Sequence, residues 1–286
     1  MWQFKWLYLL YMKRILLIAA ALLALTLGAD ARNYGFKSAE QLASMISASG
    51  HEILGTDSFY GYDRVSFDFE GHKAWVVLPK KGTAREGRPW TWTMQWAEAF
   101  VPRTNVPQML ADGYHHVTID TFDHRMDEEG LRISADFQKF LVGTLGFAPK
   151  ANLIGMSWGG FFSVRYASRY PDSVRKIYLD APLLNFDGFN PESIGPWKDR
   201  EPAEGWSSCA EMPVNMAGKI ASAGIPVLIV YGGQDQTVPP GLNSAIFIER
   251  LRNAGASVKD IFRGGYGHHP HGIELDDLTI KEFFDR

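Results

Sequence analysis

The chain has 286 residues, of which 46% are apolar, and a formal net charge of −3 at neutral pH. This length and composition are enough for one large α/β domain with a full core. Lysine and arginine are scattered along the chain, which excludes the basic footprint of a nucleic-acid-binding protein. The single cysteine, Cys209, excludes an intramolecular disulfide and leaves no N-terminal cysteine for a lipid anchor.

The first 31 residues are predicted to be a secretory signal peptide. Lys13-Arg14 precede an apolar stretch from Ile15 to Gly28, and small residues follow at 29–31. Met12 would start a more ordinary signal than Met1. We expect cleavage near residue 31 and a secreted or periplasmic protein with no stable membrane association. Residues 1–28 could instead remain as an anchor, although the two charges in their middle argue against one continuous span.

The first part of the mature chain is predicted to contain a helix, a hairpin and a loop. Residues 37–54 are typical of a helix with Ser38 as its cap. Strands at 64–69 and 72–78 flank Glu70-Gly71, which indicates an antiparallel hairpin. A polar loop over 80–88 leads into the aromatic segment 89–96, which we also expect to be a loop. A helix at 106–112, a strand at 115–120 and a longer amphipathic helix at 127–145 follow.

Residues 150–160 contain the most informative motif of the chain. The spacing Gly155-x-Ser157-x-Gly159 lies between a short apolar strand at 151–154 and a helical segment at 159–170. A strand that turns sharply into a helix strains the serine backbone, and side chains two residues to either side would collide. The turn lifts the Ser157 hydroxyl clear of the sheet, near a helix N-terminus that favours a developing oxyanion. The alternative is a plain strand–helix turn.

The remaining elements alternate again after one irregular segment. A strand at 175–180 precedes residues 183–222, which are rich in proline, glycine and aromatic residues and are predicted to be an insertion over the active edge. A strand at 226–231, a helix at 241–253, a strand at 257–262 and a helix at about 275–284 complete the chain. The sequence therefore predicts one α/β domain over 32–286, with a mostly parallel sheet, helices on both faces and a leading antiparallel hairpin.

A carboxylate and an imidazole follow successive strands of this sheet. Asp235 comes after the strand at 226–231, and His268 follows the strand at 257–262. The carboxyl ends of parallel strands meet at one edge, so these side chains can approach Ser157. The chain order Ser, Asp, His matches a nucleophile–acid–base triad.

On these motifs the chain resembles the α/β-hydrolase superfamily over most of its mature length, and especially secreted bacterial carbohydrate esterases and prolyl-oligopeptidase-type hydrolases. The matching segments are Gly155 to Gly160, Tyr231 to Asp235 and Gly265 to His269. The resemblance implies Ser157 as nucleophile, Asp235 as orienting acid and His268 as general base. The superfamily's common His-Gly oxyanion motif after its third strand is absent, and the equivalent loop is expected at 88–92.

The expected mechanism proceeds through an acyl-enzyme. His268 takes the serine proton, and the N–H of Trp158, with a second donor near Trp92, stabilises the oxyanion. His269 and His271 remain alternative bases, and Asp180 remains an alternative acid. Asp120, His115 and His116 are expected to have no chemical role.

The three clustered histidines, His268, His269 and His271, could instead bind a metal. Adjacent side chains usually diverge, however, and no separate carboxylate–histidine motif supports a metal site. We therefore expect no metal and no cofactor.

Tryptophans dominate the predicted active edge. Core packing is one explanation. The other is a set of flat platforms for sugar rings or an aromatic acyl group, with Trp90, Trp92, Trp197 and Trp206 binding substrate and with Trp96 and Trp158 nearby. This favours an esterase that removes acetyl or feruloyl groups from carbohydrate. A serine peptidase, a general carboxylesterase or a non-catalytic binding module are the alternatives.

Overall fold

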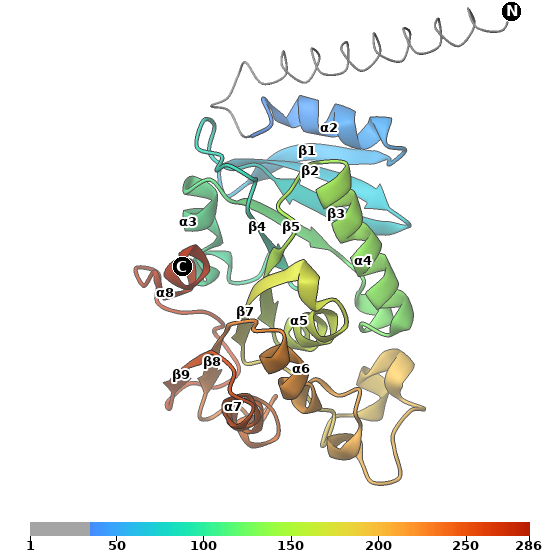
Figure 1. The fold of residues 1–286 in the computed structure, drawn as a ribbon, viewed down its shortest axis with the longest axis vertical. Coiled ribbons are helices and arrows are strands. Elements are labelled where there is room, and N and C mark those ends of the chain that lie inside the picture. Colours follow the sequence, from blue (N-terminus) through green and yellow to red (C-terminus); the bar gives the residue numbers. More distant parts are fainter. Residues whose placement is uncertain (1–34) are drawn as a thin grey trace, which may run out of the picture. The chain divides into compact units, whose positions relative to one another are not determined.

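A nine-stranded sheet lies at the centre of the computed structural model, which describes residues 35–286 (Figure 1). The strand order is β1-β2-β3-β5-β4-β6-β7-β8-β9, and the strands from β5 onward in that order are parallel. β1, β2 and β3 precede them as an antiparallel group. The predicted mostly parallel sheet with a leading antiparallel hairpin is confirmed. The strands are β1 Ile53–Phe59, β2 Tyr62–Phe69, β3 His72–Val77, β4 Trp90–Thr93, β5 His115–Ile119, β6 Ala151–Met156, β7 Val174–Asp180, β8 Val227–Gly232 and β9 Val258–Arg263.

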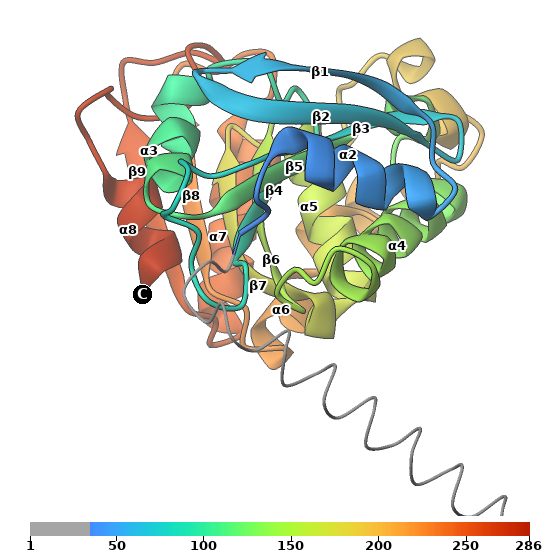
Figure 2. The same ribbon diagram turned by 90° about the horizontal axis from the view of Figure 1, so that it is seen from above.

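Helices cover both faces of the sheet, as expected for strands that are apolar on both sides (Figure 2). Residues of α3 and α8 pack in one apolar core, and those of α2, α4, α5, α6 and α7 pack in the other. The helices are α2 Ala39–Ala48, α3 Val106–Ala111, α4 Glu128–Gly143, α5 Trp158–Arg169, α6 Ala217–Ser222, α7 Ser244–Asn253 and α8 Thr279–Asp285. The side chain of Ser38 accepts a hydrogen bond from the Gln41 N–H and caps α2, as predicted.

Two strands were not predicted. The helix expected over 37–54 ends at Ala48, and β1 begins at Ile53 as an exposed edge strand with little apolar pattern. Residues 90–93, expected in a loop, form β4. β4 pairs with β5 on one side and β6 on the other, and all four of its residues are buried. The tryptophans of β4 therefore belong to the centre of the sheet and not to its edge.

Residues 183–222 contain short 3-10 helices and α6, consistent with the irregular composition of the segment. Phe186 stacks on Phe161 of α5, and Trp197 and Trp206 make edge contacts with Phe186. The segment thus has an aromatic core of its own, continuous with that of α5. The signal peptide expected over residues 1–31 lies outside the described residues. Within residues 35–286, no helix has the length and apolarity needed to cross a membrane.

Candidate active site

Ser157 occupies a strained turn between β6 and α5. Its backbone has φ of 50° and ψ of −118°, a region that a residue with a side chain adopts only when the surrounding structure enforces it. The Ser157 N–H donates to the carbonyl of Asp180 at the end of β7, and its own carbonyl accepts from Leu183. These bonds hold the hydroxyl at the carboxyl edge of the parallel strands.

The glycines around the turn are required at two positions. A Cβ on Gly155 would lie 2.6 Å from the carbonyl oxygen of Gly159, and one on Gly160 would lie 2.3 Å from the Cβ of Pro182. A Cβ on Gly159 would meet the backbone nitrogen of Gln95 at 3.4 Å, an ordinary contact. The predicted collision is therefore found at Gly155 but not at Gly159. Gly160 leaves the least room for a side chain, because Pro182, which follows β7, packs directly against it.

The structure brings Ser157, His268 and Asp235 into one hydrogen-bonded line. His268 Nδ1 lies 2.8 Å from Asp235 Oδ2, and His268 Nε2 lies 3.0 Å from Ser157 Oγ. With its Nδ1–H donated to the carboxylate, the imidazole leaves Nε2 free to accept the serine hydroxyl proton. The arrangement fits a nucleophile, a general base and an orienting acid.

The Asp235 carboxylate is held by its own loop. Its Oδ1 accepts hydrogen bonds from the N–H groups of Thr237 at 3.0 Å and Val238 at 2.8 Å. Burial alone would raise the pKa of this carboxyl, but the hydrogen bonds from His268 and the two N–H groups outweigh it. The net pKa of Asp235 is lowered, so the carboxyl group is ionised at neutral pH and can stabilise the His268 imidazolium.

The two predicted oxyanion donors, Trp158 and Trp92, lie in different structural elements. Trp158 is the first residue of α5, where a helix N–H has no carbonyl one turn earlier to accept it. Trp92 lies within β4, in register with Val117 and Leu153 of the neighbouring strands. Its backbone is part of the sheet, so the prediction of a second donor at Trp92 is wrong. Gln95, in the segment that follows β4, is the residue that packs against Gly159.

The predicted tryptophan platforms are also wrong. Trp90 and Trp92 are fully buried and stack on each other, packed against residues of α4 and α5. Trp197 and Trp206 lie in the core of the segment 183–222, where the Trp197 indole N–H donates to the carbonyl of Arg125. Core packing explains all four. Among the tryptophans of residues 35–286, Trp96 alone is exposed, at 42%.

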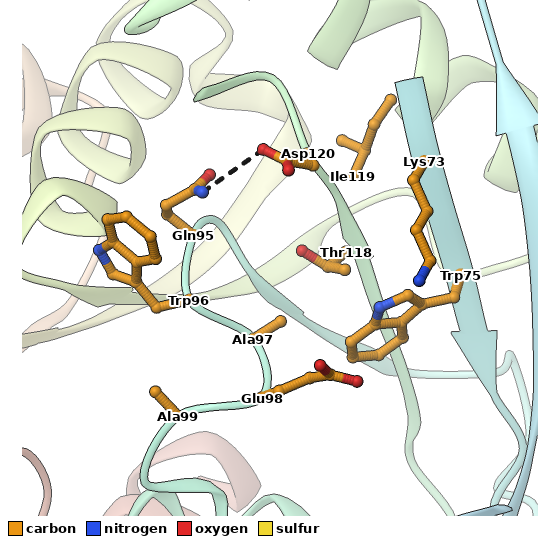
Figure 3. Close-up of a pocket in the computed structure, with 10 residues that line it drawn as sticks. All are labelled: Lys73, Trp75, Gln95, Trp96, Ala97, Glu98, Ala99, Thr118, Ile119 and Asp120. Atoms are coloured by element: carbon orange, nitrogen blue, oxygen red, sulfur yellow. Dashed lines mark hydrogen bonds between the residues drawn. The ribbon is translucent and has the colours of Figure 1, made fainter. Parts of the chain in front are cut away.

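Trp96 borders a pocket of about 480 Å³ beside the segment that follows β4 (Figure 3). Lys73, Glu98 and Asp120 give the pocket charged groups, and the buried Trp75 lines its wall. The amide of Gln95 donates to Asp120 across one end, at 3.4 Å. Asp120 also accepts from the Phe122 N–H. The pocket therefore combines the exposed indole of Trp96 with polar groups.

A second histidine–carboxylate pair lies beside the first. His271 Nδ1 lies 2.8 Å from Asp180 Oδ1, and both side chains are buried. Asp180 also accepts from the Gly272 N–H and the Tyr178 hydroxyl. The carboxylate at the end of β7 is thus engaged with His271 and not with His268, and His268 is the histidine in contact with Ser157.

The expected divergence of the three histidines is wrong. The rings of His268, His269 and His271 are 4.8 Å apart between centroids for every pair, because the loop turns at Pro270. His268 has the carboxylate partner predicted for it, Asp235, whereas the pairing of His271 with Asp180 was not predicted. A histidine repeat in a glycine-rich loop was the only signal of this cluster.

His115 and His116 are buried within β5, away from the serine. Burial lowers the pKa of each to about 3, so both rings are neutral at neutral pH. The His116 ring is held by the Thr91 hydroxyl of β4, at 2.7 Å. They are core residues, as expected for strand positions with no chemical role.

Comparison with known proteins identifies the architecture. Residues 96–203 match the family model described as alpha/beta hydrolase fold. The S-formylglutathione hydrolase of Agrobacterium tumefaciens aligns over 82% of this chain and 96% of its own, with a TM-score of 0.56 and 17% identity. The dipeptidyl peptidase 4 of Porphyromonas gingivalis aligns over 82% of this chain with a TM-score of 0.55 and 16% identity. This chain spans 35% of that peptidase.

A short similarity links the chain to one curated protein. Over 34 residues it is 50% identical to the 1-acylglycerol-3-phosphate O-acyltransferase ICT1 of Saccharomyces cerevisiae. The aligned part is 12% of this chain and 9% of the yeast protein. At these identities and coverages, the structural similarities establish the fold and leave the reaction to be argued from the site.

Proposed function

We propose that this chain, which has the α/β-hydrolase fold, is a serine hydrolase of carboxylic esters. The observation that carries the proposal is the line from Ser157 through His268 to Asp235, with contacts of 3.0 and 2.8 Å. Ser157 attacks the ester carbonyl while His268 takes its proton. Asp235 fixes the tautomer of His268 and stabilises the imidazolium that forms. The alcohol leaves with the proton from His268, and water then releases the acyl group.

The oxyanion of each tetrahedral intermediate needs two N–H donors in this scheme. The first is Trp158, at the N-terminus of α5. The second is assigned to the backbone around Gln95, the residue that packs against Gly159 in the first turn of that helix. Losing one such donor typically raises the barrier by about 3 kcal/mol.

The pocket beside Trp96 supports a carbohydrate ester as substrate. An indole face packs against the apolar face of a sugar ring, and the charged groups of Lys73, Glu98 and Asp120 hydrogen-bond its hydroxyls. In this proposal Trp96, rather than the four buried tryptophans, is the aromatic platform for the sugar ring. We assign the acyl group to acetyl or feruloyl, and we place the enzyme outside the cytoplasm, where decorated polysaccharide is found.

A substrate panel tests this function. The rates with p-nitrophenyl acetate, acetylated xylooligosaccharides, methyl ferulate and peptide amides are compared as kcat/KM. We expect the sugar esters to give the highest value and the peptide amides to give no turnover above that of Ser157→Ala. Preference for the amides would make the enzyme a peptidase, and no preference among esters would make it a general carboxylesterase.

Trp96 tests the sugar pocket directly. Trp96→Ala is expected to lower kcat/KM for acetylated xylooligosaccharides by about tenfold or more, because one aromatic stacking contact is lost. The value for p-nitrophenyl acetate should change less than about threefold, since this small ester has no sugar ring to stack on the indole. Trp96→Phe is the matched control and should retain most of the activity toward the sugar ester. An equal loss with both substrates would contradict the pocket assignment.

A further inference from the structure

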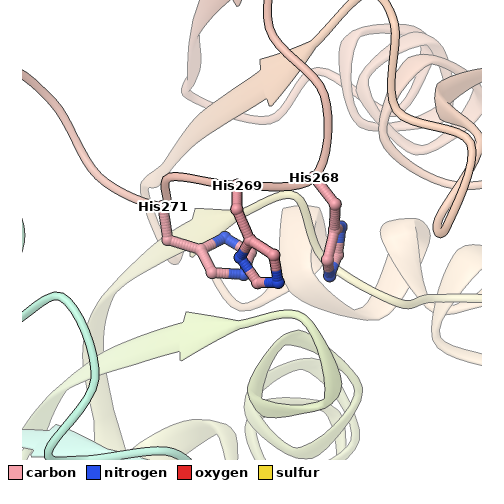
Figure 4. A group of neighbouring side chains, drawn as sticks. All are labelled: His268, His269 and His271. Atoms are coloured by element: carbon pink, nitrogen blue, oxygen red, sulfur yellow. The ribbon is translucent and has the colours of Figure 1, made fainter.

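Three imidazoles converge beside the serine. Figure 4 shows the rings of His268, His269 and His271 projecting to the same side of their loop. A nitrogen from each lies within 4.8 Å of the others, and each pair of rings is steeply inclined, at 65 to 89°. Three imidazoles that bind one tetrahedral ion at about 2.1 Å have ring centroids about 5 Å apart. The spacing of the rings is close to this arrangement.

Carboxylates orient two of these rings for a metal ion. Asp235 holds Nδ1 of His268, and Asp180 holds Nδ1 of His271, both at 2.8 Å. Metal-binding histidines typically donate one ring N–H to a carboxylate, which leaves the other nitrogen to ligate and makes it more basic. The two carboxylates also offset the charge of a divalent ion.

His269 is suited to complete the set. Its side chain is exposed, and within residues 35–286 no hydrogen bond holds either of its ring nitrogens, so the ring can move toward an ion. Phe100 packs against the rings of His269 and His271 and provides an apolar wall.

We propose that His268, His269 and His271 bind one divalent transition-metal ion of the Zn²⁺ class, and that this ion inhibits the enzyme reversibly. The inhibition, but not the binding, rests on the proposed hydrolase function. Nitrogen ligands with this geometry favour Zn²⁺ over Mg²⁺ or Ca²⁺, which prefer oxygen. The ion is coordinated by Nε2 of His268, the same nitrogen that accepts the Ser157 proton in the reaction. The base is then unable to activate the serine until the ion leaves.

Binding is measured without reference to activity. Metal-free Ser157→Ala protein, full length, is titrated with ZnCl₂ by calorimetry and with CoCl₂ by visible absorption. We expect one ion per chain, a Kd of about 10 µM or tighter, and the intense absorption of tetrahedral Co²⁺. In the same Ser157→Ala protein, His269→Ala should weaken binding at least about tenfold, and Asp180→Asn should weaken it by about 10- to 100-fold.

A second surface cluster provides the matched control. His72, Asp123 and His124 also place potential ligand atoms within 4.8 Å of one another. His124→Ala in the Ser157→Ala protein should leave zinc affinity and stoichiometry unchanged. If His124→Ala abolishes the single site, or if His269→Ala leaves the affinity unchanged, the proposed site is wrong.

Inhibition is measured with the wild-type enzyme and p-nitrophenyl acetate. Excess ZnCl₂ should lower the rate at least tenfold, and EDTA should restore it. The zinc-free His269→Ala enzyme should retain the wild-type rate within about threefold and should resist zinc. Binding without inhibition would overturn the regulatory part of the proposal. Absence of turnover in zinc-free wild type would instead contradict the hydrolase function, with the binding titration still deciding the metal site.

Discussion

Ser157 combines chemical function with backbone strain. Its φ of 50° is a conformation in which a Cβ costs of order 1 kcal/mol and glycine costs almost nothing. Ser157→Gly should therefore be more stable toward urea than Ser157→Ala by about 1 kcal/mol, although both are inactive. Equal midpoints for the two variants would show that the turn is not strained.

The two histidine–carboxylate pairs are expected to have different roles, with His268–Asp235 acting in the reaction and His271–Asp180 stabilising the fold. Asp235→Asn should lower kcat by about 10⁴, because the amide favours the wrong tautomer of His268. Asp180→Asn should lower kcat far less and should mainly reduce the free energy of unfolding, since Asp180 accepts from three groups of the fold. Steady-state kinetics and urea unfolding of both variants measure this. A comparable loss of kcat in Asp180→Asn would show that His271 takes part in the reaction.

Residue order and the family resemblance indicated Ser157, Asp235 and His268, with His269, His271 and Asp180 as alternatives, since these residues follow strands that end at the same edge. The partnership of Asp180 with His271 was not predictable. It depends on how the loop after β9 turns back over the end of β7, and no local pattern encodes that contact. The contact between Gln95 and Gly159 was not predicted for a different reason. The position of Gln95 depends on where β4 ends, and β4 itself was not predicted.

At the scale of elements, the turn from β6 into α5 depends on one close contact. Gly160→Ala should destabilise the protein by about 2 to 4 kcal/mol, because the new methyl group would overlap the Pro182 ring and force the helix away from β7. Gly159→Ala is the matched control in the same helical turn and should change stability by less than about 1 kcal/mol. Urea midpoints measure both. Equal losses of stability in Gly159→Ala and Gly160→Ala would show that the contact of Gly160 with Pro182 is not the specific steric constraint.

β4 shows why an element can be missed. Its four residues alternate tryptophan and threonine, which fits a strand, but the run is short and every position is buried. Two hydrogen bonds tie β4 to β5: the Thr91 hydroxyl bonds the His116 ring, and the backbone carbonyl of Thr93 accepts from the Thr118 hydroxyl. Such partners are absent from the local sequence. The long amphipathic helix α4 and the apolar strands β6 and β8 were predicted within a few residues, because they carry their own pattern.

At the scale of the molecule, stability should fall in mild acid. His115 and His116 have folded-state pKa values of about 3, below their value near 6.5 in the unfolded chain. Between these values the unfolded chain binds more protons, so their contribution is complete above pH 6.5 and is lost as the pH falls toward 3. Two such histidines make the free energy of unfolding depend on pH with a slope of up to about 2.7 kcal/mol per pH unit.

His115→Leu tests this slope. The variant should reduce the dependence of the unfolding free energy on pH between 4 and 6 by about 1.4 kcal/mol per unit. The measurement is urea unfolding at several pH values, with the partly buried His124→Ala as control. A slope unchanged by His115→Leu would show that the ring is protonated in the folded state.

The central claim is that folding makes Ser157 a nucleophile. The most direct measurement is the intact mass of the folded protein after treatment with a fluorophosphonate, followed by peptide mapping. The account predicts one adduct, on Ser157, and none after Ser157→Ala, with labelling greatly slowed in His268→Ala. An unlabelled folded protein, or an adduct on another serine, would contradict the hydrolase assignment and favour a non-catalytic role for the fold.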